Sequence, residues 1–347
     1  MLMILLACTG PDTGPVETSP IGVGDGSPGS VGWTTILDSD GDLTDPRDLG
    51  FDEDGRLWVA NREDDATFII TDPGTNSQEH ERRVDPYAEH FMEETSALSF
   101  DGNGQFGSCG ETRNTYNGQS PPNDYTGPVL WTTNLDIFAN VNPIGLGSHL
   151  DMLHESPNCV GIAWQADNIY WVFDGKNGDI VQYDFQGDHG PGMDDHSDGI
   201  IHRLTEVEVS FEKDAPGHMV IDHETGLLYV ADTGAGRVLW IDTASGEDAG
   251  RLVASDPGVK QREWEGVDWG VLIEGLDKPG GLALGDGALY VAEWGSGVIV
   301  EFDLQGTELR SLDTGFGEEA LYGIELGPDG KLWVVDNGTA SVSRIDP

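Results

Sequence analysis

The chain has 347 residues, with 63 acidic side chains against 17 basic ones and a formal net charge of -46 at pH 7. A surface this negative repels phosphate backbones and anionic lipid head groups, which excludes nucleic acids and acidic membranes as partners. The charge suits cationic ligands, divalent metals or a salty medium, and it also keeps a protein soluble without any specific partner. The 49 glycines and 10 tryptophans favour many short strands joined by tight turns.

The first eight residues predict a location outside the cytoplasm. They form a short apolar run that ends in Leu5-Leu6-Ala7-Cys8, which resembles a bacterial lipoprotein cleavage box. The resemblance implies that Cys8 becomes the lipidated first residue, so we expect the cell envelope or the extracellular side, with membrane contact only through a lipid anchor. Residues 9–31 are rich in Gly, Pro, Ser and Thr and predict a flexible tether. Because no Lys or Arg precedes the run, a fortuitous match is the alternative.

A pattern that repeats along the chain predicts the fold. Each copy has a short apolar strand, an Asp/Gly turn, a strand that ends in an aromatic–Val pair, a polar turn and a further strand. Five clear copies and a degenerate one, the second in order, span residues 48–61, 97–109, 161–174, 218–232, 281–293 and 323–336. Their starts recur every 40 to 65 residues or so, which is typical of propeller blades with loop insertions.

One copy closely matches a known repeat. Residues 229–238 read Tyr-Val-Ala-Asp-Thr-Gly-Ala-Gly-Arg-Val, which resembles the consensus of the NHL-repeat six-bladed β-propeller family, and the likeness extends over residues 45–347. It implies an all-β fold, a six-bladed β-propeller with four-stranded antiparallel blades, each starting with its inner strand, in a domain of residues 32–347. The last blade lacks an outer strand, and residues 32–37 are expected to supply it and close the ring. We expect such a propeller to be a monomer.

The turn after the second strand of each blade carries a polar or cysteine side chain on the face around the channel. The equivalent positions are Asn61, Cys109, Asp174, Asp232, Glu293 and Asp336. Four carboxylates in a ring could bind a cation, but an Asp in such a turn more often caps it by accepting backbone N–H bonds. Asp174 and Glu293 are the better candidates for a functional role, and Arg62 is a third, for catalysis or recognition.

The loop that leads into the third inner strand is the richest in metal-binding side chains. It offers His149, Asp151 and His154, which the blade assignment places on the channel side. His218, at the start of the neighbouring inner strand, is expected to join them at the mouth of the channel. Imidazoles with cysteine and methionine sulfur nearby suit zinc or copper more than magnesium.

Cys109 and Cys159 have two interpretations. They belong to adjacent blades and to the same face, and Cys8 is the only other cysteine. In an oxidising compartment they would form a disulfide that pins two loops, whereas in a reduced state their thiolates would be metal ligands. The disulfide is the favoured interpretation, and the histidines could still bind a metal without the cysteines.

A second loop, at residues 188–199, is dense in carboxylates, glycine and histidine. Its candidate ligands are Asp194, Asp195, His196 and Asp198, which predict a structural ion such as calcium. The blade assignment places this loop on the face opposite the first loop, so a structural ion or a solvated acidic loop is expected there rather than a catalytic site.

The NHL likeness relates the chain distantly to two groups of propeller enzymes, the peptidyl-hydroxyglycine amidating lyases and the streptogramin lyases. The former place a zinc-binding His before several inner strands. The matching positions here are Val160, Gly217, Gly280 and Tyr322, with His218 displaced by one. We therefore expect a metal-centred site of lyase or hydrolase type in a different arrangement. The alternative is a non-catalytic envelope propeller that binds a small molecule or peptide, with cations favoured by the charge; the fold alone does not decide between them.

Overall fold

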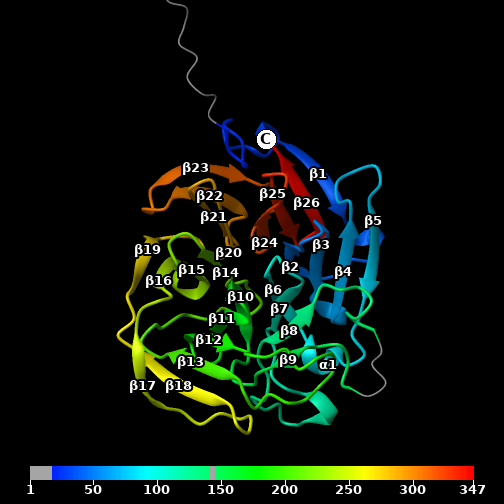
Figure 1. Cartoon of the computed structure of the whole chain (residues 1–347). Helices are drawn as coiled ribbons and strands as arrows, with labels where there is room; N and C mark the ends of the chain where they lie inside the picture. The colour runs from blue at the N-terminus through cyan, green and yellow to red at the C-terminus, as the bar shows by residue number, and fades with distance from the viewer. Residues whose placement is uncertain (1–17, 141–144) are drawn as a thin grey trace, which may run out of the picture.

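The computed structural model describes residues 18–140 and 145–347. Within them the chain forms six sheets around a central axis, and each blade has four antiparallel strands (Figure 1). The inner strands, which gather around the axis, are β2 (Pro46–Phe51), β6 (Thr95–Phe100), β10 (Cys159–Ala166), β14 (Met219–Asp222), β20 (Pro279–Gly285) and β24 (Leu321–Leu326). The six-bladed propeller predicted from the repeats is confirmed.

The other strands complete each blade from the axis outward. Blade 1 continues with β3 (Leu57–Asn61), β4 (Ala66–Thr71) and β5 (Glu79–Arg83), and blade 2 with β7 (Gln105–Gly110), β8 (Val129–Thr132) and β9 (Asp151–Met152). Blade 3 continues with β11 (Ile169–Asp174), β12 (Asp179–Asp184) and β13 (Ile200–Leu204), and blade 4 with β15 (Leu227–Asp232), β16 (Arg237–Asp242) and β19 (Trp269–Glu274). Blade 5 continues with β21 (Ala288–Glu293), β22 (Val298–Asp303) and β23 (Glu308–Asp313), and blade 6 with β25 (Leu332–Asp336) and β26 (Ser341–Asp346).

Blade 6 takes its outermost strand from the N-terminal side of the described chain. β1 (Gly32–Leu37) pairs antiparallel with β26, from Gly32 opposite Asp346 to Leu37 opposite Val342. The strand order of this sheet is therefore β1-β26-β25-β24. Pairing of this kind covers the edge of β26, which would otherwise expose unpaired backbone groups.

The segment just before β1 lies against blade 5. The Ser19 hydroxyl donates to the Glu301 carboxylate at 2.5 Å, and Ile21 is buried in the core next to Tyr290. The prediction of a flexible tether is therefore wrong for the part of residues 9–31 that the structure describes, because an apolar side chain in this Gly/Pro-rich stretch anchors it. Cys8 lies outside the described residues.

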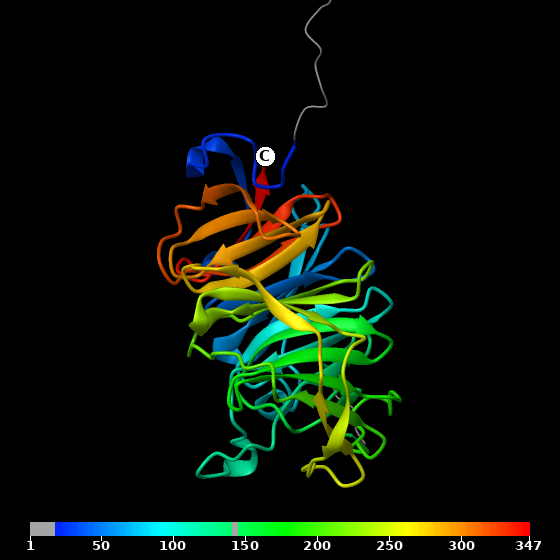
Figure 2. The ribbon, with the colours of Figure 1, turned by 90° about the vertical axis from the view of Figure 1, so that its left-hand side faces the viewer.

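Blade 3 carries two more strands than the repeat pattern predicts. Between β16 and β19 the chain leaves blade 4 and forms a hairpin of β17 (Glu247–Arg251) and β18 (Lys260–Glu265). β18 pairs parallel with β13, so this sheet has six strands in the order β10-β11-β12-β13-β18-β17. Figure 2 shows the yellow hairpin running past the green strands of blade 3 at the edge of the propeller.

Glycines of the repeat allow the inner strands to approach one another at one end of the channel. A Cβ on Gly161 would lie 2.1 Å from the Gly217 carbonyl oxygen, and one on Gly281 would lie 2.3 Å from the Tyr322 carbonyl oxygen. Distances this short are sterically forbidden, so only glycine fits at these positions. The Gly–Ile and Gly–Leu pairs of the sequence pattern thus mark the places where neighbouring inner strands meet.

The aromatic–Val pairs of the second strands form the core between blades. Trp58, Tyr229, Tyr290 and Trp333 are at most 2% exposed. A blade has neighbouring blades on both of its faces, so its second strand is apolar on both sides instead of alternating, and all five residues of β3 are buried. Helices contribute little: α1 (Ala88–Phe91) is a single turn. In the described ranges no helix is long and apolar enough to cross a membrane.

Candidate metal centre at the propeller rim

The two metal-binding loops predicted on opposite faces meet in one site at the outer edge of blades 2 and 3. His149 and His154 flank β9, the outermost strand of blade 2, and the loop after β12 folds over them. The Gly192 N–H donates to the His149 carbonyl oxygen at 2.7 Å, and the His196 ring contacts the Asp151 carboxylate at 2.6 Å. The separation of the two loops was wrong, because β9 is only two residues long and leaves the first loop at the rim. We call His149, Asp151, His154 and His196 the rim cluster.

Each imidazole of the rim cluster is held through its Nδ1 atom. His149 Nδ1 lies 2.8 Å from the Leu146 carbonyl oxygen, His154 Nδ1 lies 3.0 Å from both oxygens of Asp256, and His196 Nδ1 lies 2.6 Å from Asp151. The other ring nitrogen, Nε2, takes no part in these contacts. Metal-binding histidines almost always donate their second N–H to a carbonyl or carboxylate in this way.

Three polar atoms of the rim cluster are buried without a hydrogen-bond partner. They are His149 Nε2, His154 Nε2 and Asp151 Oδ2. The three side chains are 2% exposed or less, and leaving such groups unpaired in a protein interior costs free energy. The ring centroids of His149 and His154 lie 6.5 and 5.5 Å from that of His196. In the described residues, however, only Asp151, His189 and Asp198 have ligand atoms that all lie within 4.8 Å of one another, so one ion shared by the three orphaned atoms requires these side chains to move closer together.

Aromatic side chains fix the histidine rings from outside. Tyr125 stacks on His154 with ring centroids 3.7 Å apart, and its hydroxyl donates to Asp256 at 2.8 Å. Phe91 stacks on His149 at 3.7 Å, and His90 stacks on His154 at 5.6 Å.

Three members of this surrounding were missed from the sequence: His90, Tyr125 and Asp256. They come from α1, from the loop between β7 and β8, and from the β17–β18 hairpin. None lies in a loop that is rich in ligands, so spacing gave no signal. Only knowledge of the hairpin's position could have identified Asp256.

Burial keeps the imidazoles in the form that binds metals. It lowers the pKa of His149 to about 4 and that of His90 to about 4, and it lowers the pKa of His154 despite the opposing Asp256 carboxylate. Burial acts the same way on His196, but the hydrogen bond and charge of Asp151 outweigh it and raise the pKa of His196 overall. Neutral imidazole is the ligand form, so His149 and His154 need no deprotonation at pH 7.

The site becomes more accessible towards the second loop. Asp151, His189 and Asp198 each offer a ligand atom within 4.8 Å of the others, and the last two side chains are partly exposed. Asp194 and Asp195 do not join this group: both are exposed, and Asp195 accepts from the backbone N–H of Ser197. The predicted ion loop therefore contributes His196 and Asp198, together with His189.

His218 is not part of the rim cluster, contrary to the prediction. It directly precedes β14, an innermost strand, where its Nε2 lies 3.3 Å from the Ser96 carbonyl oxygen and its Nδ1 lies 3.5 Å from Asp48. These partners belong to the inner strands β6 and β2, so His218 lies at the axis while His149 and His154 lie at the rim. The register of the blades was correct, but the loop before β10 follows an outer strand and starts far from the channel.

The three candidate catalytic residues make structural contacts. Asp174 accepts the backbone N–H groups of Lys176 and Asn177 and pairs with Arg203 at 2.8 Å. Glu293 accepts the Asp277 N–H and the Ser296 hydroxyl, each at 2.9 Å. The interpretation as a cap of its own turn accounts for Asp174, whereas Glu293 holds the segment before β20.

Arg62 bridges segments on the face around the channel. Its guanidinium contacts Glu94 at 2.8 Å and Asp214 at 2.9 Å. Cys109 and Cys159 form the expected disulfide between blades 2 and 3, at a sequence separation of 50, so their sulfurs are not free metal ligands.

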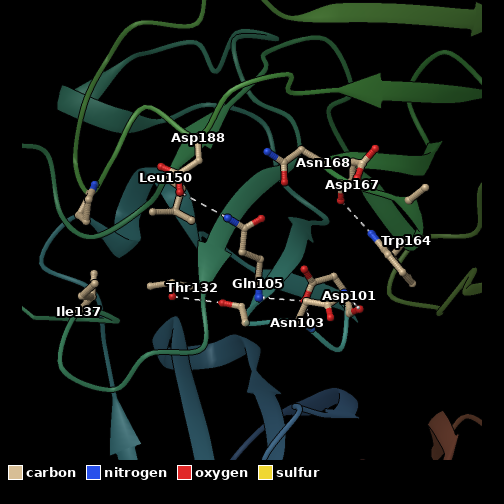
Figure 3. A pocket seen from close by; sticks show the side chains of 13 residues that line it. Asp101, Asn103, Gln105, Thr132, Ile137, Leu150, Trp164, Asp167, Asn168 and Asp188 are labelled. Carbon is tan, nitrogen blue, oxygen red and sulfur yellow. Dashed lines mark hydrogen bonds between the residues drawn. The ribbon is translucent and has the colours of Figure 1, made fainter.

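A pocket of about 770 Å³ adjoins the second loop (Figure 3). Its lining includes the carboxylates of Asp101, Asp167 and Asp188 and the ring of Trp164, and none of its lining residues is Lys or Arg. The Gln105 side-chain amide reaches towards Asp188 across the pocket, as the dashed line shows. Carboxylates beside an aromatic ring suit a cationic or hydroxyl-rich ligand.

Comparison with known proteins gives the fold. No family model and no curated protein matches the sequence. Among solved structures, an auxiliary nutrient binding protein from Bacteroides ovatus has a TM-score of 0.54 at 13% identity, over 91% of this chain and 73% of that one. The calcium-binding protein regucalcin from Agrobacterium tumefaciens has a TM-score of 0.51 at 14% identity, over 87% and 90%, and a luciferin-regenerating enzyme has 0.50 at 13%, over 88% and 92%. Regucalcin and the luciferin-regenerating enzyme are six-bladed β-propellers, and so is this chain.

Proposed function

We propose that this chain is an extracytoplasmic propeller that binds one transition-metal ion, zinc or copper, at the rim cluster. The Nε2 atoms of His149, His154 and His196 would be the imidazole ligands, with Asp151 as the carboxylate beside them, and the rings would move towards Asp151 on binding, because among the four only Asp151 belongs to a group of ligand atoms within 4.8 Å of one another. One observation carries the proposal: all three rings are anchored through Nδ1, and two of the three Nε2 atoms are buried without a partner.

The donor set supports a borderline metal over a hard one. Imidazole nitrogen suits zinc and copper, whereas calcium and magnesium prefer six or more oxygen ligands. Three histidines with a further position towards solvent are the arrangement of catalytic zinc sites, in which the metal activates a bound water. The partly exposed His189 and Asp198 lie on that side, and this supports metal-centred chemistry of the hydrolase or lyase type.

The cellular location is part of the same proposal. A disulfide between Cys109 and Cys159 supports an oxidising compartment, where such bonds persist. Lipidation at Cys8 would then anchor an NHL-like propeller to the cell envelope, with residues 9–17 between the anchor and the part that packs on blade 5.

A second candidate function is favoured by the pocket of Figure 3. Its volume and its carboxylates support a non-catalytic module that captures a cationic or hydroxyl-rich small molecule or peptide. In that case the rim metal would stabilise the second loop, which also lines the pocket through Asp188 and Pro191.

Metal analysis of the full-length protein tests the proposal. After loading with zinc or copper and exhaustive dialysis, the wild type should retain about one equivalent by elemental analysis. The His149→Ala/His154→Ala double variant should retain less than about a tenth of that. His80→Ala is the matched control, because His80 is exposed on β5 of blade 1 and should leave the metal content unchanged. Equal metal in the double variant and the wild type, or none in either, would refute the metal site.

A further inference from the structure

The central channel contains a second cavity, which shares Trp164 with the pocket of Figure 3. It has a volume of about 270 Å³ and lies between residues of all six inner strands. Most of its walls are apolar: Leu49, Leu98, Ile162, Met219 and Leu282 form them. A cavity of this size and polarity fits a compact apolar body of about one ring.

Contacts between neighbouring inner strands narrow one end of the channel. The Gly217 N–H donates to the Val160 carbonyl oxygen and the His218 N–H to that of Gly280, each at 3.0 Å, so β10, β14 and β20 meet there. Beyond them, Arg47 and the Tyr322 hydroxyl both donate to the carbonyl oxygen of Asp214. The cavity is therefore reached from the opposite end of the inner strands.

The other end has an aromatic mouth. Trp164 and His223 line the cavity there, with ring centroids 4.9 Å apart, together with Phe51 and Phe100. Aromatic faces attract organic cations as well as apolar groups. The mouth therefore suits a ligand that has both a cationic group and an apolar group.

Glu325 is the only carboxyl group among the residues that line this cavity, and none of them is Lys or Arg. Within the described part of the chain it makes no hydrogen bond or ion pair. Burial, with a smaller contribution from the negative charge of Asp48, raises the pKa of Glu325 to about 8. The other titratable groups near it are His218, which faces Asp48, and His223 at the mouth.

We propose that the channel binds a small organic cation, an ammonium group on a compact apolar body, with the ammonium paired to Glu325. The apolar strands would bury the body, and the carboxylate would gain the partner that the protein does not provide. A divalent metal ion fits less well, because it needs several oxygen ligands and the cavity has one carboxyl group among apolar walls. The net charge of -46 concentrates cations around the molecule and favours their capture.

Calorimetric titration of the full-length protein with benzylamine and with benzyl alcohol tests the proposal. The two probes have nearly the same shape and differ in charge. At pH 8 the wild type should bind benzylamine at least about tenfold more tightly than the alcohol, since only the amine pairs with the carboxylate. Glu325→Gln should reduce this preference to within about twofold, because it keeps the shape of the side chain but removes its charge. Glu308→Gln, the same change on an exposed residue of β23, should retain the preference.

The pH dependence gives a second readout. Between pH 6 and 8 the affinity of the wild type for benzylamine should rise by up to tenfold per pH unit, because Glu325 must release its proton to form the ion pair. In Glu325→Gln the rise should disappear, which separates this group from His218 and His223. Equal binding of the two probes, an amine preference that survives in Glu325→Gln, or binding of neither probe would overturn the proposal. The His149→Ala/His154→Ala variant should bind benzylamine like the wild type, so this result is independent of the rim metal.

Discussion

Blades 4 to 6 follow the repeat closely, whereas blades 2 and 3 carry long loops between the strands of the same repeat. In the regular blades the turn after the second strand is short and its carboxylate has a structural role: Asp336 caps its own turn, and Asp232 accepts from the Ser210 N–H and from Arg237. In blades 2 and 3 long loops follow β7, β8 and β12, and the hairpin from blade 4 adds to the edge. The rim cluster lies among these insertions. The repeat therefore forms the six-bladed ring, and the loops inserted into the repeat carry the side chains that can bind a metal.

The largest effect is expected from the bond that joins the elaborated blades. A Cys109→Ala/Cys159→Ala double variant should lose about 4 kcal/mol of unfolding free energy, because the disulfide closes a loop of some 50 residues in the unfolded chain. Urea denaturation of the full-length protein measures this. Reduction of the wild type should reproduce the loss. A change below about 1 kcal/mol would show that blades 2 and 3 hold together without the bond.

Two turn carboxylates compare the blades directly. Asp174→Ala in blade 3 should cost about 3 kcal/mol, because it removes four hydrogen bonds and leaves the buried Arg203 with Asp179 as its remaining acidic partner. Asp336→Ala in blade 6 should cost about 1 kcal/mol, because its contacts are to the Thr339 N–H and hydroxyl. Denaturation curves of the two variants give the difference. Equal costs would mean that Arg203 does not distinguish blade 3.

A smaller change in unfolding free energy is expected from Glu325, which lines the central channel. The pKa of Glu325 in the folded protein, about 8, lies above the ordinary value of 4.5, so folding favours its protonated form. The stability that this group contributes is complete below pH 4.5 and is lost as pH rises to about 8. Between pH 5 and 8 the wild type should therefore lose about 2 kcal/mol relative to Glu325→Gln, allowing for the water that enters the channel. Parallel pH profiles of the two proteins would contradict the raised pKa of this carboxyl group.

The repeat explains how much of the fold was predictable from the sequence. Blade number, inner strands and the disulfide follow from local patterns: the Gly–Ile pairs mark the close approaches, and Cys109 and Cys159 stand in adjacent blades. The candidate site depended instead on long-range placement. His149 and His154 were recognised as ligands, but His218 was assigned to them because the two-residue strand β9 left no detectable pattern. Asp256 could not be found, since a parallel pairing between blades has no signature in the sequence.

The pairing of β18 with β13 determines how late in synthesis the rim cluster can be completed. Asp256 lies in the bend of this hairpin, 102 residues after His154, whose backbone N–H and ring it contacts. During synthesis, blades 2 and 3 emerge from the ribosome well before that carboxylate is made. In the newly made chain the His154 ring therefore lacks its Asp256 partner. It gains this partner only when the hairpin, which follows in the sequence as part of blade 4, folds back against blade 3.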